Sequence, residues 1–390
     1  AMTLFLYPYC MKNSSNGRTK AWLWLIAIAL ITLSAIGWSG DDGETNGKDD
    51  KVHVGIVLPI TGKYASISED IAHAVELAQE DFAEDVAISI EDSAGEPQKG
   101  ISAITHLIAN KQSDVVLAGI GSSINIAMSP IAEREKTPFL AISATPELMK
   151  KDDYAFTLQP SINREAAKLA AIASSHGAKT AATIHDSTSD TLSAGSEVFE
   201  DEFMALGGSV VATEGYGKDI DYRTVATKAI SKNPDVIYVS AQDKVSGPFV
   251  KQLRELKYDG LIIGFSGSES AEFIRSAGSG AEGFIITSIP FSCGSSAHTK
   301  QYCDTFKSRF GKDPQQYGAY AYDALKLIAE AGKNCEDVSG EKMKACLIKT
   351  SQSLENPLTD LFGLDASGDL SDQIPLFIKK VEGGKFVEVD

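Results

Sequence analysis

"VHVGIVLPI", residues 52–60, and "SISEDIAHAVELAQEDF", residues 66–82, set the architecture of this chain. The first stretch is rich in β-branched apolar residues, as expected of a buried strand. The second predicts an amphipathic helix, with its apolar residues on one face and Ser68 as a candidate N-cap. A buried strand that leads into such a helix is the first unit of a parallel α/β sheet.

Strand-like and helical patterns alternate through most of the remaining chain. Up to residue 143 we expect strands at 86–92, 114–120 and 138–143 and helices at 97–110 and 123–135. From residue 180 we expect strands at 180–186, 209–215, 235–241, 260–265 and 283–289 and helices through 196–206, 222–231 and 247–256. Crossover helices between strands place helices on both faces of a parallel sheet. The sequence therefore predicts an α/β fold of two doubly wound parallel-sheet lobes.

Length and charge limit the classes of function. The 390 residues, 43% of them hydrophobic, are enough for two domains with cores of their own. The formal net charge is -17, from 36 Lys and Arg against 53 Asp and Glu, and no basic run offsets it locally. A nucleic-acid-binding surface is not expected on such a chain.

The first 37 residues have the three-part pattern of an export signal. Residues 11–20 carry three basic residues and no acid, residues 21–36 are apolar, and Ala35 and Gly37 are small residues suited to cleavage before Trp38. Met11 is then the natural start. An apolar run of about sixteen residues is short for a membrane span of about twenty, but an uncleaved anchor stays open. We expect an exported protein, periplasmic or at the cell surface, with an acidic linker at 38–51.

Four cysteines follow the signal, and they form two close pairs. In an oxidising compartment the simplest of three possible pairings joins Cys293 to Cys303 and Cys335 to Cys346. Four buried free thiols are an alternative. A four-cysteine zinc site is weaker, because neither pair has zinc-knuckle spacing.

Two segments that follow strands are candidates for ligand contact. In "AGIGSSINIAMSP", residues 118–130, Gly119 and Gly121 allow close approach of the backbone, and Ser122 and Ser123 offer hydroxyl and N–H groups at a helix start. Such a place suits an anion, particularly a carboxylate. The alternative is that a serine only caps its helix. The next loop, "ISATPELM" at residues 142–149, has the same character.

Motifs of catalysis are not found. The chain has no G-x-S-x-G elbow, no G-x-G-x-x-G fingerprint and no G-x-x-x-x-G-K-[ST] phosphate loop. The six histidines lack metal-ligand spacing, and His185 beside Asp186 fits a structural role better than an acid–base pair. We therefore expect neither an enzyme nor a bound cofactor or metal.

Four collinear stretches, at residues 54–78, 119–148, 317–328 and 358–370, resemble the type I periplasmic binding proteins, specifically the branched-chain amino acid (Leu/Ile/Val) receptor family of ABC importers. The resemblance implies two lobes joined by a three-crossing hinge. Lobe one would comprise 51–159 plus 290–350, and lobe two 160–289 plus 351–390. It also implies that a small ligand, captured when the hinge closes, is passed to an ABC permease in the membrane.

Half of the family's ligand contacts carry over to this chain. The resemblance places the ligand carboxylate at Ser122, with Ser123 adjacent. Carboxylate and ammonium contacts of the next loop fall on Ser143, Ala144 and Thr145, in a loop that is one residue shorter here. An aromatic contact falls on Tyr317.

The second lobe departs from the family pattern. Where the family usually has a Tyr-Gly pair, this chain has Asp190 and its neighbours. Where the family has its next aromatic contact, this chain has Gln242. The acid that would meet the ligand ammonium falls near Ser266, with Glu269 as the closest replacement and Asp190 as another. Both acids are also compatible with ordinary solvated loops. These changes favour a ligand more polar than leucine, an amino acid or another small carboxylate.

A sensor of the same fold, tethered to the membrane and reporting to a signalling receptor, is the alternative to transport. Nothing in residues 51–390 separates the two roles.

Overall fold

Two β-sheets organise the computed structural model, which describes residues 51–62, 64–143, 154–288, 291–359, 363–364 and 376–389. All of these residues fall within one compact unit, Asp50–Asp390. None of the helices in these ranges has the length and apolar character needed to cross a membrane.

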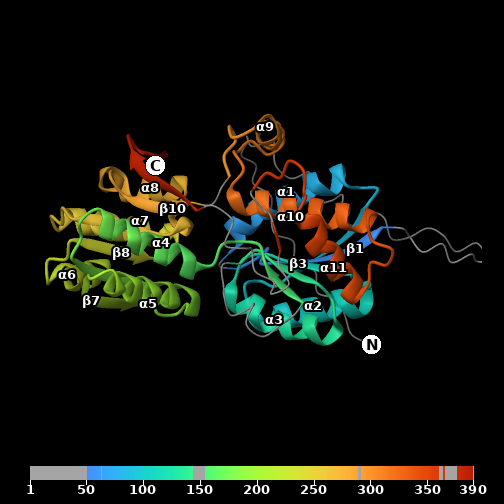
Figure 1. The fold of residues 1–390 in the computed structure, drawn as a ribbon, viewed down its shortest axis with the longest axis horizontal. Helices are drawn as coiled ribbons and strands as arrows, with labels where there is room; N and C mark the ends of the chain where they lie inside the picture. The colour runs from blue at the N-terminus through green and yellow to red at the C-terminus, as the bar shows by residue number, and fades with distance from the viewer. Residues whose placement is uncertain are drawn as a thin grey trace, which may run out of the picture. The chain divides into compact units, whose positions relative to one another are not determined.

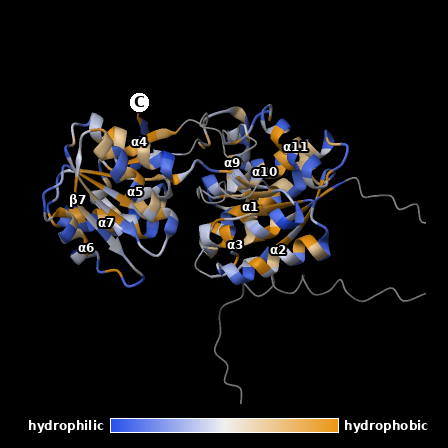
Figure 2. Cartoon of the chain, turned by 60° about the horizontal axis from the view of Figure 1, so that its bottom comes forward, coloured by the Kyte–Doolittle hydropathy of each residue, from blue (hydrophilic) through white to orange (hydrophobic). Residues whose placement is uncertain are grey.

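The first sheet has the strand order β2-β1-β3-β4-β5, and every pairing in it is parallel. Figure 1 marks β1 and β3 of this sheet. Its strands are β1 (Val52–Leu58), β2 (Val86–Asp92), β3 (Val115–Ala118), β4 (Phe139–Ala141) and β5 (Ala155–Thr157). Helices α1 (Ala65–Asp81), α2 (Pro97–Lys111) and α3 (Ser122–Glu135) connect them. Figure 2 shows hydrophobic and hydrophilic residues on these three helices, as expected when one face of each covers a sheet.

The second sheet has the strand order β12-β11-β10-β9-β8-β6-β7. Its strands are β6 (Thr180–Asp186), β7 (Ser209–Tyr216), β8 (Val236–Ser240), β9 (Leu261–Gly264), β10 (Ile285–Ser288), β11 (Phe377–Glu382) and β12 (Lys385–Val389). Its helices are α4 (Ile162–Ser175), α5 (Asp190–Ala205), α6 (Tyr222–Ile230), α7 (Asp243–Glu255) and α8 (Ala271–Ala277). Strands β6 to β10 pair in parallel, which confirms the predicted doubly wound pattern.

The last two strands are an exception that the sequence analysis did not predict. Strands β11 and β12 form an antiparallel hairpin, and β11 also pairs antiparallel with β10. The hairpin turns at Gly383 and Gly384, both with positive φ, which is the backbone that a tight two-residue turn requires. The second sheet is therefore mixed at this edge.

The chain passes between the two sheets three times. A first core packs around β1, β3 and the late helices α9 (Ala297–Phe310), α10 (Gln316–Lys333) and α11 (Gly340–Ser351). Two further cores pack against the second sheet, and their buried residues lie between 162 and 286. Val381, from β11, also packs in one of them. Leu354, Leu358 and Leu364 pack in the first core, so that core extends beyond the boundary expected at residue 350.

Two disulfides join the cysteines as the simplest pairing predicts. Cys293 bonds to Cys303 and Cys335 to Cys346, with Cα–Cα separations of 5.7 and 5.9 Å. The alternatives of free thiols and of a four-cysteine zinc site are thereby excluded. Both bridges lie against the first core.

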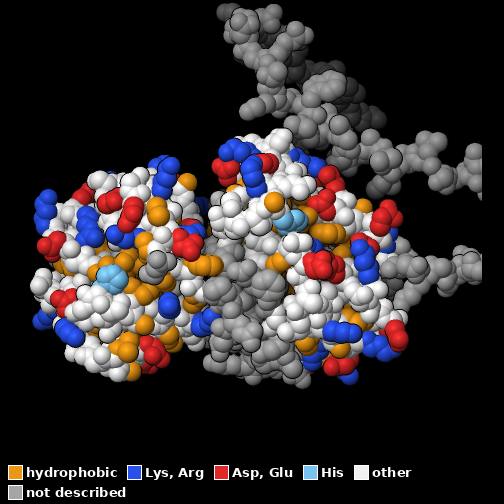
Figure 3. All heavy atoms as spheres, turned by 45° about the horizontal axis from the view of Figure 1, so that its top comes forward, with side chains coloured by type: hydrophobic (Ala, Val, Ile, Leu, Met, Phe, Trp, Pro, Cys, Tyr) orange, Lys and Arg blue, Asp and Glu red, His pale blue; other side chains and the backbone are white. Residues whose placement is uncertain are grey.

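Surface charges are locally mixed. On the face drawn in Figure 3, Lys and Arg side chains are interspersed with Asp and Glu. Several form short-range pairs, as Arg309 does with Glu76 and Glu80. Exposed pairs of this kind contribute little to stability.

Asp70 is buried between α1 and α10, and its ionisation is expected to influence stability. It is 2% exposed and accepts hydrogen bonds from the N–H groups of Gln315 and Gly318 at the start of α10. Burial raises its pKa from 3.8 to about 6, although these hydrogen bonds oppose the rise. Since the folded protein then holds this proton more tightly than the unfolded chain, the group's contribution to the free energy of unfolding falls as pH rises from about 4 to about 6.

We expect Asp70→Asn to remove this pH dependence. Relative to the parent, the variant should gain roughly 2 to 3 kcal/mol between pH 4 and pH 7, whatever its absolute stability. Urea unfolding of both proteins at several pH values measures the difference. A constant difference across this range would contradict the assignment.

Candidate functional site

A cavity of about 540 Å³ lies where helices begin after the carboxyl ends of strands. The starts of α3, α4, α5, α7 and α10 all contribute lining residues, so both sheets supply part of its wall. Ligands of open α/β sheets bind at such strand ends, where helix N-termini leave N–H groups unpaired. This cavity is the candidate ligand site.

The start of α3 supplies hydrogen-bond donors to the cavity. Gly121 is the N-cap, and its φ of 123° is a backbone that L side chains rarely adopt. Ser122 and Ser123 follow and line the cavity, and among the described residues their N–H and hydroxyl groups have no hydrogen-bond partner. Asn125 holds this turn in place by donating from its amide to the carbonyl of Gly119, at 2.9 Å. The helix start is therefore open to an acceptor such as a carboxylate.

Gln159 is a lining residue that the sequence analysis missed. It lies two residues after the end of β5, before the chain enters the second sheet, and it is 5% exposed. Its side-chain Nε2 is buried and has no hydrogen-bond partner in the described part of the chain. Because an unsatisfied buried donor is costly, this amide is a further candidate for contact with a ligand acceptor.

Glu165, in the first turn of α4, is a second lining residue missed from the sequence. It is 1% exposed, and its carboxylate accepts hydrogen bonds from the Ser266 N–H at 2.9 Å, the Ser266 hydroxyl at 3.0 Å and the Thr287 hydroxyl. Burial raises its pKa, and these hydrogen bonds oppose the rise. The cavity thus contains a carboxyl group withdrawn from water.

Three more charged residues of the wall lie at or near the ends of β6 and β7 and the start of α5. Asp190, exposed at the first position of α5, lines the cavity together with Asp186 at the end of β6. Asp186 accepts hydrogen bonds from the N–H and hydroxyl of Thr188. Lys218 is the sole basic residue among the described lining residues.

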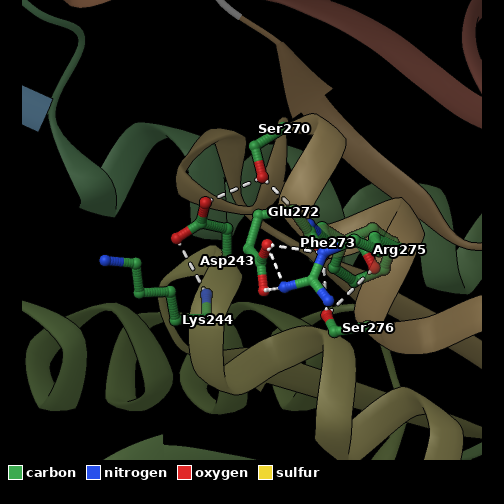
Figure 4. A network of polar contacts seen from close by, with 7 residues as sticks. All are labelled: Asp243, Lys244, Ser270, Glu272, Phe273, Arg275 and Ser276. Atoms are coloured by element: carbon green, nitrogen blue, oxygen red, sulfur yellow. Dashed lines mark hydrogen bonds and ion pairs between the residues drawn. The ribbon is translucent and has the colours of Figure 1, made fainter. Parts of the chain in front are cut away.

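Gln242 lines the cavity as the N-cap of α7. The start of this helix is anchored by the network in Figure 4, in which Asp243 accepts hydrogen bonds from the Ser270 hydroxyl and the Lys244 N–H. Ser270 in turn caps α8 by accepting from the N–H of Phe273. Gln242 is therefore presented by a helix start that is tied to its neighbour.

Ser266 and Glu269, both predicted near a ligand ammonium, lie in different surroundings. Ser266 lines the cavity and donates to Glu165. Glu269 is outside the described lining, where its carboxylate pairs with the Lys379 ammonium and accepts from the Ser288 hydroxyl. The structure therefore places Glu165, and not Glu269, beside Ser266 at the wall.

The first sheet also contributes aromatic and small polar lining. Tyr317, in the first turn of α10, lines the cavity with Tyr64. Burial raises the pKa of Tyr317, with a smaller contribution from the charge of Glu165. Ser143, just after β4, is buried and lines the cavity.

The structure therefore brings most of the predicted site residues to one cavity. Ser122, Ser123, Ser143, Asp190, Gln242, Ser266 and Tyr317 all line it. Ala144 and Thr145 lie outside the described residues. No group of three His, Cys, Asp or Glu side chains that could hold a metal ion occurs in the described ranges.

Comparison with known proteins places the chain among binding proteins. A family model described as periplasmic binding protein matches residues 51–376. The Leu/Ile/Val-binding protein BraC3 of Rhizobium johnstonii is 23% identical over 351 residues, covering 87% of this chain and 94% of the relative. The leucine-, isoleucine-, valine-, threonine- and alanine-binding protein of Pseudomonas aeruginosa is 23% identical over 333 residues, covering 82% of this chain and 87% of the relative.

Solved structures share the fold over the same part of the chain. A leucine-binding protein from Thermotoga maritima MSB8 superposes with a TM-score of 0.76 at 23% identity, covering 87% of this chain and 98% of that one. A branched-chain amino acid binding protein from Streptococcus pneumoniae, in complex with isoleucine, gives 0.74 at 20% identity and coverages of 87% and 100%. A solute-binding protein from Rhodopseudomonas palustris BisB5, in complex with 3,4-dihydroxybenzoic acid, gives 0.74 at 22% identity and coverages of 87% and 96%.

Proposed function

The chain belongs to the periplasmic binding protein family, and we propose that it captures an amino acid or similar small carboxylate in the cavity and delivers it to an ABC permease. The family consists of substrate-binding proteins rather than enzymes. Relatives named for binding leucine, isoleucine and valine, and a structural neighbour holding isoleucine, support this class of ligand. The neighbour that holds a dihydroxybenzoic acid supports carboxylates more generally.

One observation carries the proposal: the open start of α3 faces the same cavity as the buried amide of Gln159. The N–H and hydroxyl groups of Ser122 and Ser123 are open to an acceptor, and the buried Nε2 of Gln159 needs one. A ligand carboxylate supplies two acceptor oxygens and a negative charge that suits a helix N-terminus. Three such hydrogen bonds, each contributing roughly 1.5 to 3 kcal/mol, are enough for binding of about micromolar affinity after the ordering costs.

The disulfides and the family together support an exported location, in the periplasm or at the cell surface. In that location the ligand-bound protein would meet its permease at the outer face of the membrane.

A thermal-shift screen over amino acids and small carboxylates tests the proposal. A ligand at 100 times its dissociation constant should stabilise the protein by about 2.7 kcal/mol, which is a readable rise in melting temperature. A screen in which no amino acid or organic acid raises the melting temperature would count against the proposed function.

For a ligand found in this way, Ser122→Ala is expected to weaken binding roughly 10-fold, because it removes one hydrogen bond to a charged group. Titration calorimetry measures the change. Ser102→Ala is the matched control, since the Ser102 hydroxyl lies on an exposed turn of α2 and bonds only to the Gln98 carbonyl. Equal affinities of Ser122→Ala and Ser102→Ala for the ligand would show that the Ser122 hydroxyl does not contact it.

A further inference from the structure

The segment between β1 and α1 brings Tyr64 to the cavity wall. Tyr64 is the N-cap of α1 and lines the cavity. A Cβ built at Gly121, the N-cap of α3, would lie 3.5 Å from Cε2 of the tyrosine ring. The ring also packs against the core that α2 and α3 share with the first sheet. Tyr64 therefore lies beside the helix start that is open to an acceptor, and its position depends on how the segment before it is held.

Asp92, the last residue of β2, holds this segment from outside the described cavity lining. Its carboxylate accepts a hydrogen bond from the Thr61 hydroxyl at 2.6 Å and a longer one from the Thr61 N–H at 3.3 Å. The same carboxylate accepts from the Ala94 N–H at 2.7 Å, so one side chain ties the β1–α1 segment to the turn that follows β2. Burial opposes ionisation of Asp92, but these hydrogen bonds outweigh it and lower its pKa. At neutral pH the contact is therefore charge-assisted.

A close backbone contact supports the same arrangement. Gly62 has a φ of 84°, and a Cβ built there would lie 2.3 Å from the carbonyl oxygen of Ala94, an approach that only glycine permits. Ala94 has a φ of 49°, and the turn around it is closed by the Glu96 N–H, which donates to the Ser93 carbonyl at 2.8 Å. The segment thus lies against a hydrogen-bonded turn just before it reaches Tyr64.

We propose that the contact between Asp92 and Thr61 positions Tyr64 for ligand binding. Neither Asp92 nor Thr61 belongs to the described cavity lining, so both act through Tyr64 as positioning residues. Because their contact fixes the segment before a ligand arrives, the ligand does not have to order the tyrosine ring, which would lower its affinity. This inference rests on the proposed function, since it requires a ligand in the cavity.

Thr61→Val tests the proposal, because valine keeps the shape of the side chain and removes the hydroxyl. The probe is the compound that raises the melting temperature of the parent protein most, in a panel of the standard amino acids and small carboxylates such as 3,4-dihydroxybenzoic acid. Titration calorimetry of this probe on the full chain should show an affinity about 3- to 10-fold weaker in Thr61→Val than in the parent. Thr61→Ser, which retains the hydroxyl, should stay close to the parent. Asp92→Ala should weaken binding at least as much as Thr61→Val, which keeps the proposal testable if Thr61→Val fails to fold.

Tyr64→Ala separates a positioning role from a role in stability alone. In the Tyr64→Ala background, Thr61→Val should leave the remaining affinity for the probe within about twofold, because no ring is left to position. A contact that only stabilises the fold would give the same fold-change with and without the ring.

Thr180→Val is the matched control. The Thr180 hydroxyl and N–H both donate to the Asp235 carboxylate at 2.9 Å, and the hydroxyl also accepts from the Asp235 N–H. This contact lies at the start of β6, and neither residue belongs to the described cavity lining. The variant should lose at least as much stability in urea as Thr61→Val, yet bind the probe as the parent does.

Two results would overturn the inference and leave the proposed function intact. One is an affinity for the probe that is equal in Thr61→Val, Asp92→Ala and the parent. The other is an equal loss of affinity from Thr61→Val with and without the Tyr64 ring. If no compound of the panel binds the parent protein, the proposed function falls together with the inference.

Discussion

Replacement of Gly121 by Ala is expected to weaken ligand binding by roughly 10- to 100-fold and to lower the free energy of unfolding by roughly 1 to 3 kcal/mol. The φ of Gly121 is 123°, and a Cβ built there would lie 2.7 Å from Cδ1 of Ile124. To relieve the strained backbone conformation and this close contact, the start of α3 must shift. That shift would move the N–H groups of Ser122 and Ser123 away from the positions that face the cavity.

Gly207→Ala separates the effect on binding from the effect on stability. Gly207 also has a positive φ, of 87°, but no atom lies within 4 Å of its would-be Cβ, and it is not among the described lining residues of the cavity. Its variant should lose stability from backbone strain while binding the ligand as the parent does. Calorimetric titration and urea unfolding of both variants measure the two quantities. Unchanged affinity in Gly121→Ala would show that the α3 start does not contact the ligand.

Loss of the disulfides is expected to have the largest effect on stability. The bridges close loops with sequence separations of 10 and 11 residues, and each constrains the unfolded chain by about 3 kcal/mol in the loop-entropy model. The double variant Cys335→Ser with Cys346→Ser should therefore unfold at a clearly lower urea concentration. Reduction of both bridges in the parent protein should lower the free energy of unfolding by roughly 6 kcal/mol.

Ligand binding provides the control for this experiment. None of the four cysteines lines the cavity, so at low temperature the folded double variant should bind the ligand with the parent's affinity. Reductant that leaves the unfolding midpoint of the parent protein unchanged would argue that the bridges carry no such stabilisation.

The strand and helix pattern made the architecture predictable. The apolar run at 52–60 becomes β1 and pairs with two parallel neighbours, and the helical pattern after it becomes α1. Short elements were harder to predict. Strand β5 has three residues, and the C-terminal hairpin mixes charged with apolar residues, so neither has the long apolar run that identifies a buried parallel strand.

The site was predictable where it depends on helix starts. Ser122 begins α3 and Gln242 directly precedes α7, each after a predicted strand. Both residues line the cavity. Gln159 and Glu165 were missed because their role depends on burial. A glutamine before proline resembles a turn in sequence, and a glutamate in a first helical turn resembles a solvated residue that favours the helix dipole. Only the packing of α4 against Ser266 and Thr287 withdraws Glu165 from water.

Of the two acids that the sequence analysis proposed for a ligand ammonium, Glu269 lies outside the described cavity lining. Glu269 lies three residues after Ser266, which made it the nearest acid in the sequence. In the folded chain its carboxylate is neutralised by Lys379 from β11, a residue 110 positions away. Proximity in sequence therefore did not identify which acid lies beside Ser266 in the cavity wall.

The C-terminal hairpin has a consequence for self-association. Without it, β10 would present an open row of backbone N–H and C=O groups at the end of a parallel sheet of apolar strands, an invitation to pair with another molecule. Strands β11 and β12 occupy that row and end the sheet with charged side chains, among them Lys380, Lys385 and Glu388. In the first sheet, the edge strand β5 has only three residues and is too short to pair stably with a strand of another molecule. Each sheet thus has one edge that discourages edge-to-edge pairing with another molecule.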